Sequence, residues 1–316
     1  MKNFNFIEKR KLCLIISGVI LAIGLIFNII FGTKLDISFS GGTEIPFEFS
    51  GTLQQDAVEK VVDKYIPEAD VKIDEGHIMV TLADAVEMET IDKVQKDLIK
   101  TFPNNKIATS GETRSLQAAY GRTFFIKCMV AVALASILVV VYVGLRFRHI
   151  GGTSAAVMSL LALLHDILIA YFVFVIFRIP LNDNFVAVVL TILGYSLNDA
   201  IVIYDRIREN RKKMDKTHTL SEITELSLHQ SFTRTLNTSI CTLIAIGTVA
   251  VVGLIAGLES IVSFALPMSV GVIAGFYSTT FLCTPLWAVW AEKSEAIKAA
   301  KKKEKKLAKK PAKKSK

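Results

Sequence analysis

Residues 194–210 read GYSLNDAIVIYDRIREN, and the interpretation of the whole chain depends on this stretch. It begins inside a long apolar run and ends in a cluster of charged residues. Asp199 lies about two helical turns before that cluster, where lipid tails would surround an isolated helix. A bare carboxylate at such a depth costs about 2.5–3.5 kcal/mol. We therefore expect Asp199 to face the interior of a helix bundle and to have a partner there.

The composition is that of a membrane protein with several spans. Of the 316 residues, 52% are hydrophobic, and the mean hydropathy is +0.46. The net charge of +8 is concentrated at the C-terminus, because residues 292–316 contain 12 Lys and only 3 Glu. The rest of the chain is close to neutral, so its charge gives no reason to expect nucleic-acid binding.

The reactive residue types do not form a catalytic or metal-binding pattern. The sequence contains no G-x-x-x-x-G-K-[ST], no G-x-S-x-G and no H-E-x-x-H. All four cysteines lie in apolar runs, which favours small buried side chains over disulfides or zinc ligands. We expect no enzymatic activity and no cofactor other than protons as a coupling ion. The cysteines are Cys13, Cys128, Cys241 and Cys283.

Six apolar runs are long enough to cross a bilayer. The first could be a signal peptide, but it is about 20 residues long. No small-x-small cleavage site follows it, which favours a retained first span. Arginine and lysine are concentrated in two of the connections, which predicts that both termini are cytoplasmic. The runs are 12–31, 123–145, 152–177, 184–204, 237–257 and 262–290.

The segment between the first two spans is polar and is expected to fold outside the membrane. It holds 9 Lys and Arg against 16 Asp and Glu. After a short strand at its start, the alternation of apolar residues and turn signals predicts the order β-α-β-β-α-β, which is ferredoxin-like. The predicted strands are 34–39, 43–49, 69–74, 77–82 and 105–112, and the predicted helices are 52–65 and 87–102.

These features divide the chain into four parts. Residues 1–31 form a cytoplasmic N-terminus and the first span. Residues 32–120 form the external ferredoxin-like domain, and 121–290 form five further spans. Residues 291–316 form a Lys-rich tail that we expect to be disordered. The tail is suited to anchoring on anionic lipid, and binding to RNA or to an acidic partner is the alternative.

Arg234, at the start of the fifth span, is the candidate partner of Asp199. The fourth and fifth spans run antiparallel, and a long side chain entering the bundle could reach an acid about 9 Å from the boundary. Removal from water favours the neutral form of a carboxyl group, and a nearby cation favours the ionised form. A mobile pair would therefore relay protons, whereas a static pair would only fix the helix register. The residues alone leave these two possibilities open.

Other polar residues in or beside the spans form three weaker candidates. Asn198 and Thr238 accompany Asp199 and Arg234 as secondary intramembrane sites. His165 and Asp166 lie near the middle of the third span, where they could extend a proton path or hydrogen-bond two helices. The third candidate is a charge cluster at the membrane edge, for which a structural role is favoured. Its members are Asp205, Arg206, Arg208 and Glu209.

Small residues recur at a spacing of four in the last two spans. Gly253 and Gly257 form one such pair, and Gly271 and Gly275 form the other. This spacing allows two helices to approach closely. The motif is common in membrane helices and is a weak signal.

The chain resembles the SecD/SecF family of bacterial protein-export membrane proteins, in its smaller SecF-type branch. The resemblance rests on residues 194–210 and on Arg234-Thr-Leu-Asn-Thr-Ser239, and it extends from Arg10 to about Trp290. The family's external motif Gly-Ile-Asp-Phe-Thr-Gly-Gly-Thr is matched at its core. Ser38 replaces the acid before the Phe, with Asp36 two places earlier. The matched residues are Phe39, Gly41, Gly42 and Thr43.

The resemblance implies half of an RND-type bundle that pairs with SecD to complete twelve spans in the bacterial plasma membrane. It implies proton flow through Asp199 and Arg234, driven by the proton motive force, and an auxiliary role in protein translocation. The implied partners are SecD, the SecYEG channel, SecA, YajC, YidC, the unfolded secretory polypeptide and the lipid bilayer. Nucleic acid is not among them.

Two other functions are compatible with the same residues. One is an RND-like proton-coupled exporter of small or lipidic substrates, although the external domain is small for a substrate tunnel. The other is a non-transporting scaffold for a partner channel, in which the buried charges only stabilise the bundle. A scaffold predicts that Asp199→Asn retains activity, whereas a proton-coupled transporter predicts its loss.

Overall fold

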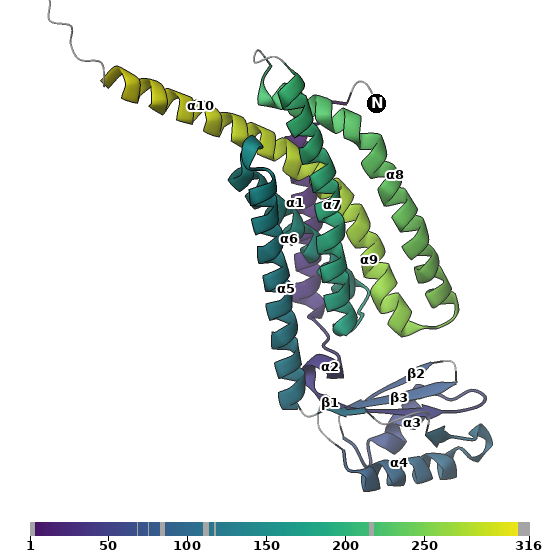
Figure 1. Ribbon diagram of the computed structural model, residues 1–316. Coiled ribbons are helices and arrows are strands. Elements are labelled where there is room, and N and C mark those ends of the chain that lie inside the picture. The colour runs from purple at the N-terminus through teal and green to yellow at the C-terminus, as the bar shows by residue number, and fades with distance from the viewer. Residues whose placement is uncertain are drawn as a thin grey trace, which may run out of the picture.

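A bundle of long helices stands above a small sheet domain in the computed structural model (Figure 1). The structure describes residues 4–308 except 68, 75, 83–85, 110–113, 117 and 215–217. Within these residues six helical stretches are long and apolar enough to cross a membrane, which confirms the predicted number of spans. They are α1 (Arg10–Phe31), α5 (Ala118–Arg146), α6 (Gly152–Ile176), α7 (Asp183–Lys213), α8 (Leu220–Ile255) and the continuous stretch of α9 (Glu259–Tyr277), the π-helical turn η3 (Ser278–Cys283) and α10 (Thr284–Ala308).

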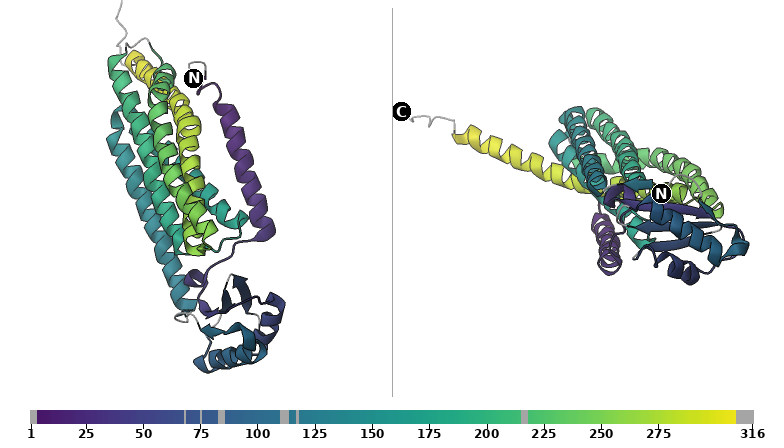
Figure 2. Two further views of the ribbon diagram at one scale, coloured as in Figure 1. Left: turned by 90° about the vertical axis from the view of Figure 1, so that its right-hand side faces the viewer. Right: turned by 90° about the horizontal axis from the view of Figure 1, so that it is seen from below.

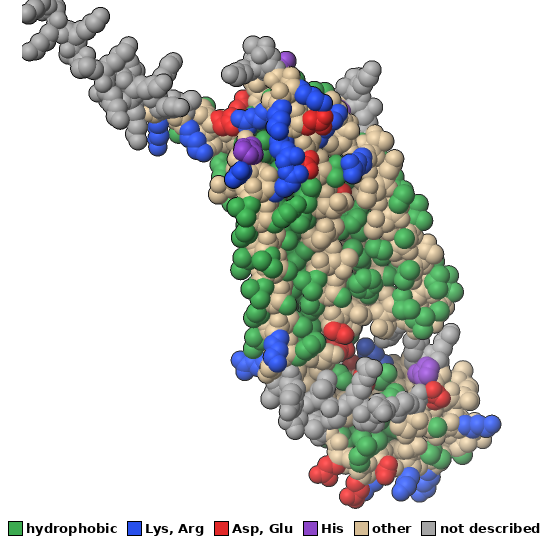
Figure 3. Space-filling model, in the orientation of Figure 1, with side chains coloured by type: hydrophobic (Ala, Val, Ile, Leu, Met, Phe, Trp, Pro, Cys, Tyr) green, Lys and Arg blue, Asp and Glu red, His purple; other side chains and the backbone are tan. Residues whose placement is uncertain are grey.

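Helix α6 is the most enclosed of the spans and lies among α1, α5, α7 and α9. Helices α1, α5 and α8 instead leave most of their large apolar side chains exposed. Hydrophobic side chains cover the middle of the bundle, and Lys and Arg gather at the end from which α10 leaves (Figures 1 and 3). We call this the charged end. The exposed apolar faces are suited to contact with lipid or with further membrane helices.

The small domain has the ferredoxin-like strand order β2-β3-β1-β4 with every described pairing antiparallel, as predicted. A further short strand, β5, also pairs with β1. Helices α3 and α4 cover one face of the sheet (Figure 1) and bury its apolar side chains. The elements are β1 (Gly42–Glu48), α3 (Gln55–Val62), β2 (Asp70–Asp74), β3 (His77–Leu82), α4 (Met88–Thr101), η1 (Pro103–Asn105), β4 (Ala108–Thr109) and β5 (Arg114–Leu116).

The strand predicted at residues 34–39 is wrong, because the chain forms the short helix α2 (Ile37–Ser40) there. Asp36 caps this helix by accepting hydrogen bonds from the backbone N–H of Ser38 at 2.9 Å and from its hydroxyl at 2.7 Å. The strand predicted at 105–112 is only two residues long, and 110–112 lie outside the described residues. Asp36 and Ser38, the acid and the serine by which this chain departs from the family motif, therefore form this cap together.

The Phe39-x-Gly41-Gly42 motif forms the joint between the sheet and α5. Gly41 and Gly42 have φ angles of 78° and 133°, a region that L side chains rarely adopt. Phe39 is buried and packs against Phe125 of α5, with ring centroids 5.1 Å apart. A Cβ on Gly121 would lie 2.6 Å from the backbone nitrogen of Gly41. The motif therefore allows close contact between two backbones.

Gly121→Ala is expected to loosen this joint. The added methyl group meets backbone atoms that cannot rotate away, so we expect the free energy of unfolding to fall by about 1–3 kcal/mol. The matched control is Gly144→Ala on the same helix, where a Cβ would make an ordinary contact of 3.7 Å with Ala156. Thermal unfolding of the two variants in detergent measures the difference. Equal melting temperatures would contradict the close contact.

The second small-residue pair lies at a helix contact. A Cβ on Gly271 of α9 would lie 2.2 Å from the Ile192 side chain of α7, and one on Gly275 would lie 3.4 Å from Cβ of Ser196. Helices α7 and α9 therefore approach closely along this line, as the spacing indicates.

The tail was expected to be disordered from residue 291, and this is wrong for 291–308, which continue α10. Ala, Lys and Glu are strong helix formers, and the start of this stretch is attached to the bundle. Glu295 forms an ion pair of 2.8 Å with Arg211, and Glu292 accepts a hydrogen bond from Ser221. Beyond these contacts α10 runs away from the bundle (Figure 2). Residues 309–316 lie outside the described residues.

Candidate proton-relay site

Asp199 lies on the buried face of α7. Its side chain is 1% exposed, and its Oδ2 atom has no hydrogen-bond partner among the described residues. Ser196 precedes it by three residues and is also buried on this face. An ionised carboxylate held in this way would lack the compensation that buried charges require. The position agrees with the expectation that Asp199 faces the interior of the bundle.

Arg234, the predicted partner, lies elsewhere. Its side chain is exposed on α8 and lines a groove of about 750 Å³ between α7 and α8, together with Asn198. In the described part of the chain neither an ion pair nor a hydrogen bond joins Arg234 to Asp199. Consecutive residues of α7 therefore face different surroundings, with Asn198 in the groove and Asp199 in the bundle.

Thr238 also faces outward, and its hydroxyl donates a hydrogen bond of 2.9 Å to the carbonyl oxygen of Arg234. This bond lies within one turn of α8 and does not involve the Arg234 guanidinium. Thr238 is therefore placed beside the cation and not beside the buried acid.

The buried acid with hydrogen-bond partners is Asp166 on α6, which is fully buried. Its Oδ2 accepts a 2.8 Å hydrogen bond from the hydroxyl of Ser196, and its Oδ1 lies 3.0 Å from Nδ1 of His165. Ser196 thus connects α6 to α7 three residues from Asp199. Of the two readings of His165 and Asp166, the helix-to-helix hydrogen bond is present in the structure.

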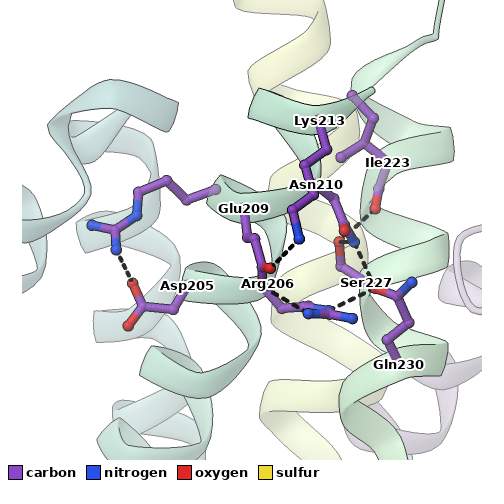
Figure 4. A network of polar contacts seen from close by, with 9 residues as sticks. Asp205, Arg206, Glu209, Asn210, Lys213, Ile223, Ser227 and Gln230 are labelled. Atoms are coloured by element: carbon purple, nitrogen blue, oxygen red, sulfur yellow. Dashed lines mark hydrogen bonds and ion pairs between the residues drawn. The ribbon is translucent and has the colours of Figure 1, made fainter. Parts of the chain in front are cut away.

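The cluster at the membrane edge links several helices at the charged end (Figure 4). Asp205 pairs with Arg146 of α5 at 3.1 Å and with Arg208 at 3.0 Å. Arg206 pairs with Glu209 at 2.7 Å and donates a hydrogen bond of 2.7 Å to Gln230 of α8. The cluster therefore joins α7 to α5 and α8.

Asp205→Asn is expected to have a small effect. Both partners of the Arg146–Asp205 pair are about one-third exposed, and ion pairs of this kind contribute about 0–1 kcal/mol. We expect the melting temperature of the purified protein to change little. The part of its salt dependence that comes from the Arg146–Asp205 pair should disappear. A loss of assembly would indicate that the cluster does more than fix the helix ends. Lys60→Gln, on the surface of α3, is the control.

Sequence reasoning missed two features. Glu225 of α8 accepts hydrogen bonds from the backbone N–H groups of Phe6 and Ile7 at 2.9 and 3.0 Å, and so fastens the N-terminal segment to the bundle. The run Ser278–Thr280 puts three buried hydroxyl groups in η3, of which Oγ1 of Thr279 lies 3.4 Å from Oγ of Ser196. The hydroxyl run was visible in the last apolar stretch. Among the described residues no group of His, Cys, Asp and Glu could hold a metal ion.

Fold and site together define a class: a multi-pass membrane protein with one ferredoxin-like domain after its first span and buried carboxyl groups on two central helices. Residues 94–293 match the family described as "Protein export membrane protein SecD/SecF, C-terminal". The chain belongs to the SecD/SecF family.

Similar proteins agree with this assignment. The chain is 31% identical to the protein translocase subunit SecF of Alicyclobacillus acidocaldarius, covering 92% of this chain and 94% of that protein. It is 31% identical to the protein translocase subunit SecDF of Bacillus subtilis, of which it spans 38%. The crystal structure of SecDF from Thermus thermophilus, a translocon-associated membrane protein, superposes with a TM-score of 0.78 at 26% identity over 91% of this chain and 38% of that one. The chain thus aligns with most of the length of that SecF protein and with about two-fifths of the SecDF proteins.

Proposed function

We propose that this chain is an auxiliary subunit of the Sec protein translocase that works with SecD and uses the proton motive force to promote protein export. Asp199 takes up and releases the proton, and Arg234 controls when it does so. A proton crossing the whole membrane provides about 2.3 kcal/mol per 100 mV. No nucleotide is needed in this scheme.

The separation of Asp199 from Arg234 is the observation that supports this proposal most strongly. A static structural pair requires the two side chains to be in contact, because a buried charge without a partner is costly. Here the acid is buried in the bundle and the cation lies in an open groove. In the proposed relay, this arrangement would be the stage at which the acid carries the proton and the cation has withdrawn.

The orientation follows from the positive charges. They gather at the end of the bundle opposite the ferredoxin-like domain (Figures 1 and 3). We place this charged end and both termini in the cytoplasm of a bacterial cell and the ferredoxin-like domain outside the plasma membrane.

SecD is the proposed partner within the membrane, and the exposed apolar sides of the bundle would receive its helices. The named relatives include SecDF proteins, in which sequence similar to this chain forms part of a longer polypeptide. SecYEG, SecA, YajC and YidC would form the surrounding machinery. The external domain would hold the unfolded polypeptide as it emerges.

Export by inverted membrane vesicles tests the proposal. Vesicles that contain the chain with SecD are expected to complete precursor uptake faster when a proton gradient is imposed, and vesicles without the chain are not. A proton-sensitive dye should report proton flow that depends on precursor. If the gradient has no effect on uptake but drives efflux of a lipophilic cation, the chain is an exporter. If the chain speeds uptake without any gradient, it is a scaffold.

A further inference from the structure

Three helical faces enclose a very small cavity lined in part by Ser196, which donates a hydrogen bond to Asp166. Its volume is about 10 Å³, close to the smallest that holds one water molecule. Helix α6 lines one side of the cavity and helix α7 lines the second, with residues four apart along each helix. The third side is formed by η3 and the start of α10. The polar side chains in its wall belong to Ser159, Ser196, Tyr204, Thr279 and Thr284.

The cavity contains a buried hydroxyl group beside Tyr204. Ser159 is 4% exposed, and its Oγ atom lies near the Tyr204 hydroxyl without a hydrogen bond of good geometry among the described residues. Ser196 lines the same cavity, and its Oγ lies 3.4 Å from Oγ1 of Thr279. A water molecule between these three hydroxyl groups would have the two to four polar partners that buried waters require. The size of the cavity and these hydroxyl groups together suit it to a single water molecule.

Asp166 lies at the inner end of this arrangement, through its hydrogen bond from Ser196. The titratable groups near it are His165 on its own helix, Asp199 on α7 and Cys283 on η3. In the described structure none of them is a lysine or an arginine. Helix α9 covers the site at Gly275, where a Cβ would make an ordinary contact of 3.6 Å with Oδ2 of Asp166.

We propose that Asp166 is a second proton-binding residue, which exchanges its proton through Ser196 with one water molecule held between Ser159, Ser196 and Thr279. The proposal rests on the proposed proton-driven function. A protonated water at this position donates a proton to Oγ of Ser196 as Ser196 passes its own proton to Oδ2 of Asp166. The water is left neutral, Ser196 keeps its hydroxyl group, and the carboxylate becomes a neutral carboxyl group; release of the proton reverses the step. Tyr204 lines the same cavity about two turns of α7 from Ser196, on the side toward the charged end.

The π-helical turn supports a functional role for this cavity. π-Helical turns inside longer helices are rare and occur often at functional sites. Here η3 places Thr279 toward Ser196, and Thr280 adds a second buried hydroxyl without a partner in the described structure.

Infrared difference spectroscopy of the chain with SecD in lipid bilayers tests the site directly. On changing pH, the wild type is expected to show the carbonyl bands of two protonated carboxyl groups. Asp166→Asn should remove one band, and Asp199→Asn the other. Ser196→Ala should shift the Asp166 band, because its carbonyl group loses a hydrogen bond. Thr235→Ala is the control, since this buried hydroxyl bonds only to backbone carbonyls of its own helix. An unchanged Asp166→Asn spectrum overturns the proposal.

Export assays separate this proposal from the function on which it rests. Asn at position 166 can still accept the hydrogen bond from Ser196, so a merely structural Asp166 would tolerate the change. We expect gradient-driven export to fall to background in Asp166→Asn. Loss in Asp199→Asn with normal export in Asp166→Asn overturns the second site alone, and normal export in both overturns the proposed function. If Asp166→Asn does not assemble with SecD, the infrared spectrum of Ser196→Ala serves as the test instead. An unshifted Asp166 band in that spectrum overturns the second site.

Discussion

Asp199→Asn is expected to reduce gradient-driven export to the level of vesicles that lack the chain, while the variant still assembles with SecD. Asparagine has nearly the shape of aspartate but cannot take up and release a proton. Oδ2 of Asp199 has no hydrogen-bond partner in the described structure, so replacing this oxygen with an amide disrupts no visible bond. Co-purification with SecD and precursor uptake by inverted vesicles measure the two properties.

Asn198→Ala on the neighbouring position is the matched control for Asp199→Asn. Asn198 is exposed in the groove, and we expect its loss to leave most of the gradient-driven uptake. Normal export by Asp199→Asn would contradict the relay. Loss of the complex itself would assign Asp199 to packing, and this outcome too would contradict the relay.

The spans could be predicted because hydrophobic length is a local property of the sequence. Each apolar run became a helix, and the family motif at 194–210 identified the helix with the buried acid. Two helix ends extend well beyond the apolar runs, in α7 to Lys213 and in α8 back to Leu220. These polar turns are held by the ion pairs at the charged end and by the Thr219 capping box, which involve residues that a hydropathy pattern does not register.

The short helix α2 and the helical tail were missed for different reasons. In α2, apolar residues alternate with serines, and this alternation is also what a strand would show. The Asp36 cap stabilises the helix instead of the strand. In the tail, composition indicated disorder, but Glu292 and Glu295 attach the helix to the bundle. Both errors arise because a few side-chain contacts outweighed the average character of a segment.

The site was predicted in part. Burial of Asp199 follows from the cost of a carboxylate in lipid, and the structure agrees. The contact between Asp199 and Arg234 was inferred from helix direction and side-chain length, which do not fix the rotation of α8 about its axis. That rotation places Arg234 in the groove. The bond between Ser196 and Asp166 depends on the packing of α6 against α7, which the sequence does not specify.

The combined variant Asp199→Asn with Arg234→Gln is expected to export no worse than either single variant. If the two residues act as one relay, removing either already stops it, and the second change costs nothing more. Residues that act as a unit show this strong non-additivity. If Arg234 instead serves independently in the groove, for example by binding lipid headgroups, the losses of free energy will add. Gradient-driven uptake rates of the four proteins, wild type included, give the coupling.

Arg234→Lys separates charge from shape within the same relay. The lysine keeps the positive charge but replaces a planar group that can hold a carboxylate through two hydrogen bonds with a single ammonium group. We expect gradient-driven uptake to fall by about tenfold, equivalent to ~1.4 kcal/mol, and not to background. Wild-type uptake would mean that a point charge is sufficient. Uptake at background would mean that the relay needs the guanidinium group itself when Asp199 releases its proton.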